Sequence, residues 1–206
     1  MFRLTPLMYQ HLEKDLRAFH GLFSDGRCQG WEQEELFVRA IRSDTSKSYR
    51  VLWQGGGHDD RKDIEIRENG NTYFINIKSG KVEGVRTPSL KISGHRLTRF
   101  NGNLEAITEY LNSSTYSVIS MSYEKIDDDH GRLHRYDLRY IDGIKFQGLD
   151  PNHWQTNYKQ DGSSVTSYSQ TNEYGVALRI SVNMSYQVWW TFPTHILDVD
   201  RRFEIR

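Results

Sequence analysis

The segment that decides the fold runs from Asp63 to Lys78 and reads Asp-Ile-Glu-Ile-Arg-Glu-Asn-Gly-Asn-Thr-Tyr-Phe-Ile-Asn-Ile-Lys. Asn-Gly between two apolar, strand-like runs is a strong signal for a tight β-hairpin. We therefore predict strands over residues 64–66 and 72–78, joined by a turn at 68–71. Alternation along the second strand places Asn76 and Lys78 on one face, roughly 6 to 7 Å apart. Asp63, at the start of the paired strand, is expected to approach the same spot.

These three side chains suit the chemistry of a metal-dependent phosphodiesterase site. A carboxylate and a second oxygen donor can hold Mg²⁺, a hard cation that prefers oxygen ligands and keeps several waters. A lysine two residues further along can orient or deprotonate the attacking water and offset the charge that develops at the phosphate. The alternative is an ordinary hairpin that carries an acid at one end and a lysine at the other.

The same residues resemble a known nuclease motif. Asp63, followed after twelve residues by Asn76-Ile77-Lys78, looks like the PD-(D/E)xK motif, with Lys62 in place of proline and Asn76 in place of the second acid. Residues 90–101 are similar to the segment after the active-site strand in type II restriction endonucleases of the EcoRV type. The resemblance covers roughly residues 30–112.

The resemblance implies both a fold and an activity. The implied fold is α/β (α+β) and restriction-endonuclease-like, with a mixed central sheet flanked by helices and a β-rich C-terminal part. The implied activity is Mg²⁺-dependent hydrolysis of double-stranded DNA at a specific, palindromic sequence by a homodimer. Asp63, Asn76 and the backbone carbonyl of Ile77 would place the metal, and Lys78 would position the nucleophile. Asn76 leaves three explanations open: a tolerated amide, an inactivating substitution or a degenerate site.

A glutamate on a predicted helix is a further candidate. Residues 31–42 have helical periodicity, with an apolar face formed by Trp31, Phe37, Val38 and Ile41. Glu34 falls near the middle of that face, where an isolated carboxylate is costly unless it is paired, binds a metal or becomes neutral. Because PD-(D/E)xK nucleases often carry such a glutamate, the resemblance gives Glu34 a catalytic and metal-binding role, with Glu35 as its substitute. The alternative is an ordinary amphipathic helix.

The stretch after the hairpin is locally basic. From Lys78 to Arg99 there are six basic residues and one acidic residue, although the whole chain balances 27 basic against 27 acidic residues. Such a surface suits DNA phosphates, and a predicted helix over residues 104–111 would present its N-terminus beside it. We assign DNA contacts here to Lys81, Lys91, Ser93, His95, Arg96, Thr98, Arg99 and Asn101. The alternative is a solvated charged loop.

Two further loops are candidates for DNA contacts. Three consecutive glycines in the run Gln54, Gly55, Gly56 and Gly57 favour close backbone approach to a partner, and the resemblance places this run along the DNA minor groove. Asp59 and Asp60 in the same loop are rivals of Asp63 as the metal ligand. Residues 161–172 are dense in short polar side chains, and we assign base contacts in the major groove to Ser163 and Ser164. For both loops the alternative is a flexible surface segment without a DNA contact.

Other patterns predict the remaining elements. Thr5-Pro6 should open a helix that ends near His20 and buries Met8, Leu12, Leu16 and Phe19. Residues 117–123 should form a core strand, and residues 176–182 and 187–192 a hairpin. We expect loops over residues 82–89 and 146–174.

Length and composition limit the class of protein. The 206 residues suffice for one core, and we expect a single domain over residues 1–206. The lone Cys28 excludes an internal disulfide framework and a multi-cysteine zinc site. With no long apolar run and no signal-peptide core, we expect a cytoplasmic protein with no membrane partner and no organic cofactor. Three alternative functions remain: a repair or junction-resolving nuclease, a catalytically decayed sequence-specific DNA-binding protein, and a structural or interaction protein.

Overall fold

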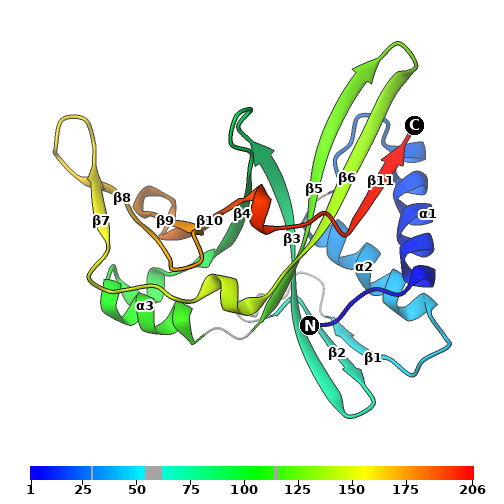
Figure 1. Cartoon of the computed structure of the whole chain (residues 1–206), viewed down its shortest axis with the longest axis horizontal. Coiled ribbons are helices and arrows are strands. Elements are labelled where there is room, and N and C mark those ends of the chain that lie inside the picture. The colour runs from blue at the N-terminus through cyan, green and yellow to red at the C-terminus, as the bar shows by residue number, and fades with distance from the viewer. Residues whose placement is uncertain (29, 54–61, 114–115) are drawn as a thin grey trace. The chain divides into compact units, whose positions relative to one another are not determined.

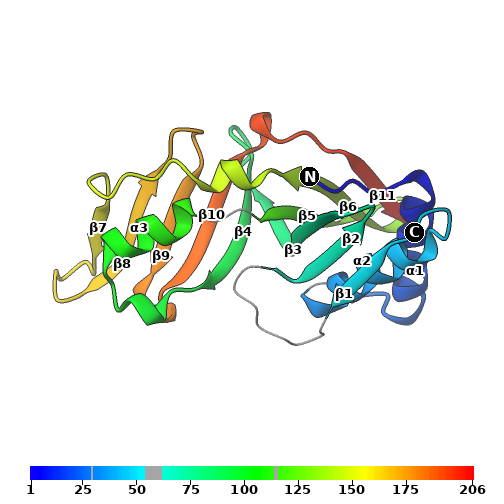
Figure 2. The ribbon, with the colours of Figure 1, turned by 90° about the horizontal axis from the view of Figure 1, so that it is seen from below.

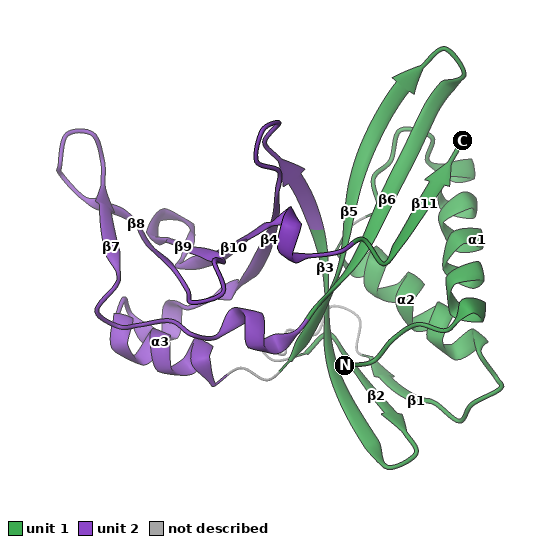
Figure 3. Ribbon diagram, viewed as in Figure 1, with its two compact units in different colours: residues 1–79, 116–141, 199–206 green, residues 80–115, 142–198 purple. Residues whose placement is uncertain are grey.

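The structure is a computed structural model that describes residues 1–28, 30–53, 62–113 and 116–206. Within these residues the chain forms three α-helices and a large mixed sheet, which agrees with the predicted α/β (α+β) class. The chain divides into two compact units, coloured separately in Figure 3. Unit 1 comprises Met1–Ser79, Tyr116–Ile141 and Val199–Arg206, and unit 2 comprises Gly80–Thr115 and Asp142–Asp198. The prediction that residues 1–206 fold as a single domain stays a prediction.

Two helices of unit 1 follow the expected apolar stripes. Thr5 caps helix α1 (Pro6–Leu22) by accepting the Met8 N–H, and Leu12 and Leu16 are fully buried. In helix α2 (Trp31–Ser43) Phe37 and Ile41 are buried as predicted, but Trp31 is 60% exposed. The predicted place of Trp31 on the buried face was therefore wrong. Trp31 is the first residue of α2, at the exposed start of the helix.

The sheet of unit 1 contains the predicted hairpin near its middle. Its strand order is β1-β2-β3-β5-β6-β11. Figure 1 shows β5 running beside β3 in the same direction, whereas the other pairs are antiparallel. The strands are β1 (Arg50–Trp53), β2 (Ile64–Glu68), β3 (Asn71–Glu83), β5 (Ser117–Asp128), β6 (Gly131–Ile141) and β11 (Arg201–Ile205).

One core joins the helices and sheet of unit 1. Helices α1 and α2 cover one sheet face, and the side chains that meet them alternate along each strand. This alternation sends the other half of the side chains to the opposite face. The core members from the sheet are Val51, Ile64, Ile66, Ile75, Ile77, Ile119, Met121, Tyr136, Leu138, Tyr140, Phe203 and Ile205.

The hairpin itself forms as predicted. Glu68 pairs with Asn71 across a two-residue turn, in which Asn69 and Gly70 have φ angles of 49° and 81°. Positive φ at both central residues is the type I′ turn that Asn-Gly favours. Strand β3 runs further than predicted, however, because Gly80 and Lys81 pair with β4 instead of leaving the sheet. The predicted loop over residues 82–89 is therefore shorter.

Unit 2 contains a second group of strands, two of which lie in a predicted loop. Its order is β3-β4-β10-β9-β8-β7, and Figure 2 shows helix α3 lying across these strands. The predicted hairpin over residues 176–192 is confirmed, but the predicted loop over residues 146–174 contains two strands. The elements are β4 (Ser89–Arg96), α3 (Leu104–Asn112), β7 (Gln155–Tyr158), β8 (Val165–Thr171), β9 (Ala177–Ser181) and β10 (Gln187–Pro193), with short 3-10 turns at Thr98–Phe100, Gly143–Phe146, Val182–Met184 and Thr194–Ile196.

The described helices also bear on membrane insertion. None of α1, α2 and α3 combines the length and the apolar character that a bilayer-spanning helix requires.

Two histidines stack inside unit 1. The ring centroids of His20 and His134 lie 3.6 Å apart, while the hydroxyl groups of Tyr136 and Tyr123 lie 2.7 Å from His20 Nε2 and 3.0 Å from His134 Nδ1. Burial, and secondarily His134, lower the pKa of His20 to about 4. Burial also lowers the pKa of His134, with Arg132 as a second cause. Both rings are therefore neutral in the folded protein at pH 7.

Cys28 lies in the same core. Its side chain is fully buried, and burial raises the pKa of its thiol to about 12. The thiol is therefore protonated and shielded in the folded protein.

The first prediction concerns the hairpin turn. Gly70→Ala should lower the free energy of unfolding by about 1 kcal/mol, because a Cβ is strained at positive φ. Gly21→Ala, at a helical position where no atom would lie within 4 Å of the added Cβ, is the control and should cost nothing. Urea unfolding followed by tryptophan fluorescence measures both. Equal stability of the Gly70 variant and the parent would contradict the assigned turn.

The second prediction concerns pH. An unfolded histidine takes up its proton near pH 6.5, whereas folded His20 does so only near pH 4. The stability that the neutral rings contribute is thus complete above about pH 6.5 and is lost as the pH falls toward 4. We expect the melting temperature to drop between pH 7 and pH 5, and the drop to shrink in His20→Gln. A pH profile of the melting temperature that His20→Gln leaves unchanged would refute the assignment.

Candidate functional site

Asp63 and Lys78 meet where strand β2 begins. The Asp63 N–H donates to the carbonyl of Ile75 at 3.0 Å, which ties the residue to β3. Its Oδ2 then accepts the Ile77 N–H at 2.8 Å and the Lys78 ammonium at 2.9 Å. The two charged side chains are only 14% and 26% exposed. The structure thus brings the expected acid and lysine into direct contact within unit 1.

Asn76 and Ile77 are the two remaining predicted site residues on β3. Asn76 is 4% exposed, and alternation places it on the same face as Lys78, opposite the core residues Ile75 and Ile77. The N–H and C=O of one residue in an extended strand point to the same edge. Because the Ile77 N–H meets Asp63, the Ile77 carbonyl is directed toward the same edge of β3.

Glu34 lies in the first turn of helix α2 and is only partly buried. Its Oε2 accepts the indole N–H of Trp53 at 3.1 Å, which joins α2 to the end of β1. The fully buried polar residue of this helix is instead Gln33, whose side-chain amide donates to the carbonyls of Cys28 at 3.0 Å and Met121 at 3.4 Å. Glu34 and Glu35 are both partly buried. Glu34 therefore shares a helix face with the buried Phe37, Val38 and Ile41 but is itself only partly buried, and its metal-binding role stays a prediction.

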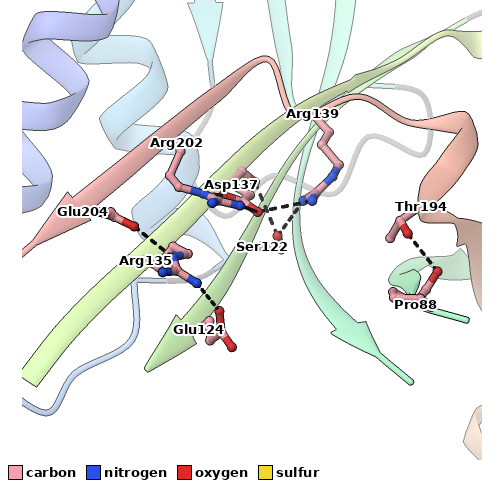
Figure 4. Close-up of polar contacts among 9 residues, drawn as sticks. All are labelled: Pro88, Ser122, Glu124, Arg135, Asp137, Arg139, Thr194, Arg202 and Glu204. Carbon is pink, nitrogen blue, oxygen red and sulfur yellow. Dashed lines mark hydrogen bonds and ion pairs between the residues drawn. The ribbon is translucent and has the colours of Figure 1, made fainter. Parts of the chain in front are cut away.

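The face that carries Asn76 and Lys78 also carries a buried charged network, which the sequence did not reveal (Figure 4). Arg139 of β6 is 5% exposed and donates to the Ser122 hydroxyl at 2.8 Å and to Asp137 at 3.2 Å. Arg202 of β11 binds Asp137 through two contacts of 2.6 and 3.0 Å. Burial raises the pKa of Asp137, but the two guanidinium groups outweigh it and hold that pKa below its usual range. The network is thus ionised and fixed.

A second acid lies on this face of β2. Glu65 is 6% exposed and pairs with Lys62 at 2.5 Å and with Arg67 at 2.6 Å. Hydrogen bonds from these two cations lower the pKa of Glu65, and the bond from Lys62 has the larger effect. Alternation from Asp63 to Glu65 was the available signal, although it could not show that Glu65 is already held by two cations.

The proposed DNA contacts fall mostly in unit 2. Lys81 and Lys91 lie directly opposite each other on β3 and β4, and Ser93 lies two residues further along β4. His95 departs from this alternation, because the β4–β10 register shifts beside it and its ring packs edge-on against Tyr110 of α3 at 5.4 Å. The structure therefore brings Lys81, Lys91 and Ser93 onto one face and turns His95 toward the helix.

The remaining contacts lie in turns. Arg96, Thr98, Arg99 and Asn101 follow one another from the end of β4 through a 3-10 turn, where the Arg99 guanidinium packs over the rings of Phe100 and Tyr110. Ser163 and Ser164 lie between β7 and β8, and Ser163 binds Asp161 through its backbone N–H and its hydroxyl. The Gln54–Gly57 segment, with Asp59 and Asp60, lies outside the described residues.

The oxygen donors bear on which metal the site could hold. Among residues 1–28, 30–53, 62–113 and 116–206 there is no group of three or more His, Cys, Asp or Glu side chains placed to hold a metal. The Asp63 carboxylate, the Asn76 amide and the Ile77 carbonyl are nonetheless hard oxygen donors. One carboxylate with neutral oxygens and waters is compatible with Mg²⁺ but binds it more weakly than two carboxylates would.

Comparison with known proteins gives no assignment. No family model matches the chain, and neither the curated proteins nor the solved structures contain a match.

The third prediction separates a structural from a functional role for the Asp63–Lys78 pair. Because the pair is partly exposed, Lys78→Met should change the free energy of unfolding by no more than about 1 kcal/mol. Lys81→Met, whose side chain is 68% exposed in its pair with Glu83, is the control and should change it less. Urea unfolding gives both values. A loss of several kcal/mol for Lys78→Met would make the pair a structural element of the sheet.

Proposed function

We propose that this chain is a Mg²⁺-dependent endonuclease that hydrolyses double-stranded DNA at a specific sequence, as a type II restriction enzyme of the PD-(D/E)xK superfamily does. The observation that carries the proposal is the contact of the Asp63 carboxylate with both the Ile77 N–H and the Lys78 ammonium, next to Asn76. The pairing of β3 with β5 inside a mixed sheet, with helices on the opposite face, supports it.

Each residue has a distinct role in the proposed reaction. Lys78, held by Asp63, presents its ammonium to the attacking water and to the scissile phosphate, where it orients the nucleophile and offsets negative charge. Asp63, the Asn76 amide oxygen and the Ile77 carbonyl would hold Mg²⁺, with Glu34 as a further ligand. Bound Mg²⁺ would polarise the scissile phosphate as a Lewis acid. The contact between Asp63 and the Ile77 N–H keeps the carboxylate directed at the edge where these donors meet.

The assembly follows from the substrate. Cutting both strands of a palindrome requires two sites related by a two-fold axis, so we propose a homodimer with one site per subunit. The nuclease would act in the cytoplasm.

A second function is favoured by Asn76. An amide replaces the acid of the motif, which leaves Asp63 as the one carboxylate among the three proposed donors on the hairpin. A sequence-specific DNA-binding protein whose catalytic site has decayed would show this pattern. It would bind DNA without a metal and would not cut even after Asn76→Asp.

The fourth prediction tests the activity. Incubation with a long natural duplex and Mg²⁺, followed by sequencing of the ends, should reveal cuts at one recurrent sequence. Lys78→Met should slow cutting by at least about 100-fold, since loss of one positioned charge-stabilising donor costs roughly 10²- to 10³-fold. Specific binding should remain. Lys125→Met, on the β5–β6 hairpin, is the control and should cut like the parent.

Two more variants sharpen this test. Asn76→Asp should increase cutting, because a second carboxylate strengthens the Mg²⁺ site. Asp63→Ala should abolish both activity and Mg²⁺ dependence. Parental cutting by Lys78→Met would remove that residue from the mechanism, and Mg²⁺-stimulated turnover by Asp63→Ala would transfer the ligand role to Asp59 or Asp60. If the parent and Asn76→Asp bind DNA but neither cuts it, the decayed-site alternative holds.

A further inference from the structure

The sheet of unit 2 has one apolar and one polar face. The apolar side chains of its central strands are buried, and they pair directly across the strands, as Ile92 does with Trp190 and Trp190 with Leu178. The alternate residues form two rows on the other face. One row joins Lys81, Lys91, Thr191, Ala177 and Thr171, and the next joins Ser93, Trp189, Arg179, Ser169 and Gln155.

A hollow of about 460 Å³ lies on this polar face. Its volume is within the range of small-ligand sites, roughly 300–1,000 Å³. Ala177 lies between Thr191 and Thr171 in its row, and its short side chain leaves the space open. The polar lining comes from strands β7 to β10 and from His153 just before β7, and it contains no acidic residue. Its members are His153, Gln155, Ser169, Gln170, Thr171, Arg179 and Thr191.

Cations gather beside the hollow. Lys81 and Lys91 are directly opposite each other, an arrangement of like charges that is unfavourable unless an anion offsets it. Glu83 pairs with Lys81 at 3.1 Å and is also within electrostatic reach of Lys91, whose ammonium lies 5.2 Å from the ring centre of Trp189. Arg179 lines the hollow, and its Nε donates to the Ser167 hydroxyl at 3.1 Å, which orients the guanidinium plane. Near the rim, His153 lies 3.6 Å from Asp150.

We infer that this hollow binds one unpaired nucleotide, with the base against Arg179 and Gln155 and a phosphate near Lys91. The choice of nucleic acid as ligand rests on the proposed function. Short side chains that stand on a sheet face cannot reach base edges stacked within an intact duplex, whereas an unpaired base can lie on the face and use its hydrogen-bonding edge. Arg179 and Gln155 supply the donors and acceptors that read such edges. Trp189 is the cross-strand partner of Arg179 and adds an aromatic side chain next to the lining residues.

This inference changes the predicted site of base recognition. Ser163 and Ser164 lie in the β7–β8 turn, and Ser163 is already held by Asp161. The strands on either side of that turn contribute Gln155 and Ser169 to the hollow instead. The specificity-determining residues are therefore on rigid strands.

The fifth prediction tests the hollow by binding without cleavage. The full chain carrying Lys78→Met is titrated, in EDTA and low salt, into a short fluorescein-labelled single strand, a perfect duplex and a duplex with one extrahelical nucleotide. The single strand or the extrahelical duplex should bind more tightly than the perfect duplex. The first result identifies a free single strand as the source of the nucleotide, and the second a base extruded from a helix.

Two variants and a matched control complete the experiment. Arg179→Ala should weaken binding roughly 10- to 100-fold, the scale of one bidentate base contact. Ala177→Leu should weaken it similarly by filling the hollow without changing the charge. Lys159→Ala removes one charge from the β7–β8 turn and should leave binding nearly unchanged. Melting curves verify that each variant is folded.

Several outcomes would overturn the inference. Parental binding by folded Arg179→Ala and Ala177→Leu would do so, as would binding of the perfect duplex alone. Displacement of the labelled strand by heparin, equally well from the parent and from Ala177→Leu, would also overturn the inference, because it would mark a non-specific surface for polyanions. The outcome is separate from the cleavage test. Hollow-dependent binding without any Mg²⁺-dependent cutting would sustain this site and refute the nuclease, and cutting without hollow-dependent binding would do the reverse.

Discussion

The capture of the Ile77 N–H by the Asp63 carboxylate is the constraint on which the rest of the site depends. The β2–β3 ladder ends at the pair of Ile64 with Ile75, so a backbone donor beyond it on β3 needs a partner. The Asp63 side chain supplies that partner at 2.8 Å and thereby fixes its own direction. Lys78 then lies within 2.9 Å of the same oxygen. One hydrogen bond of the main chain thus sets the position of the acid, and the acid sets the position of the ammonium.

The hairpin could be predicted because its signals are local. Asn69-Gly70 specifies the turn, the turn fixes the register, and period-two alternation then assigns Asn76 and Lys78 to one face. The contact of Asp63 with Lys78 follows from these steps alone. The capping of α1 by Thr5 is local in the same sense.

The errors arise where partners distant in sequence decide the outcome. Gly80 resembles the end of a strand, yet it is kept in β3 by pairing with Ile92. The strand β8 is rich in serine and threonine, so it lacks a strong apolar alternation, and its neighbours β7 and β9 hold it in the sheet. A register shift beside His95 interrupts the period-two alternation of β4, so the His95 side chain does not share the face of Lys91 and Ser93. Nothing in the order of residues 133–141 reveals that Arg139 is buried, because burial depends on the surrounding fold.

The charged network around Asp137 shows how the polar face of unit 1 is maintained. The Arg139 guanidinium and the Asp137 carboxylate are largely removed from water there, which is costly unless each charge is paired and hydrogen-bonded, whereas Arg202 is about half exposed. Arg202 makes the bidentate contact, and Arg139 adds bonds to Asp137 and Ser122. Removing Asp137 would leave two cations without their shared anion. The arrangement favours one register of β5, β6 and β11 over its neighbours, because a slip by one residue would send these charges into the apolar core.

The chain's lone sulfhydryl has a practical consequence. Cys28 is sealed in the core of unit 1 and keeps its proton, so alkylating and disulfide-exchange reagents have neither access nor a thiolate to attack. Any modification must therefore wait for the surrounding structure to open. The rate at which a thiol reagent labels this single sulfur therefore reports how often unit 1 opens, and the measurement needs no engineered probe.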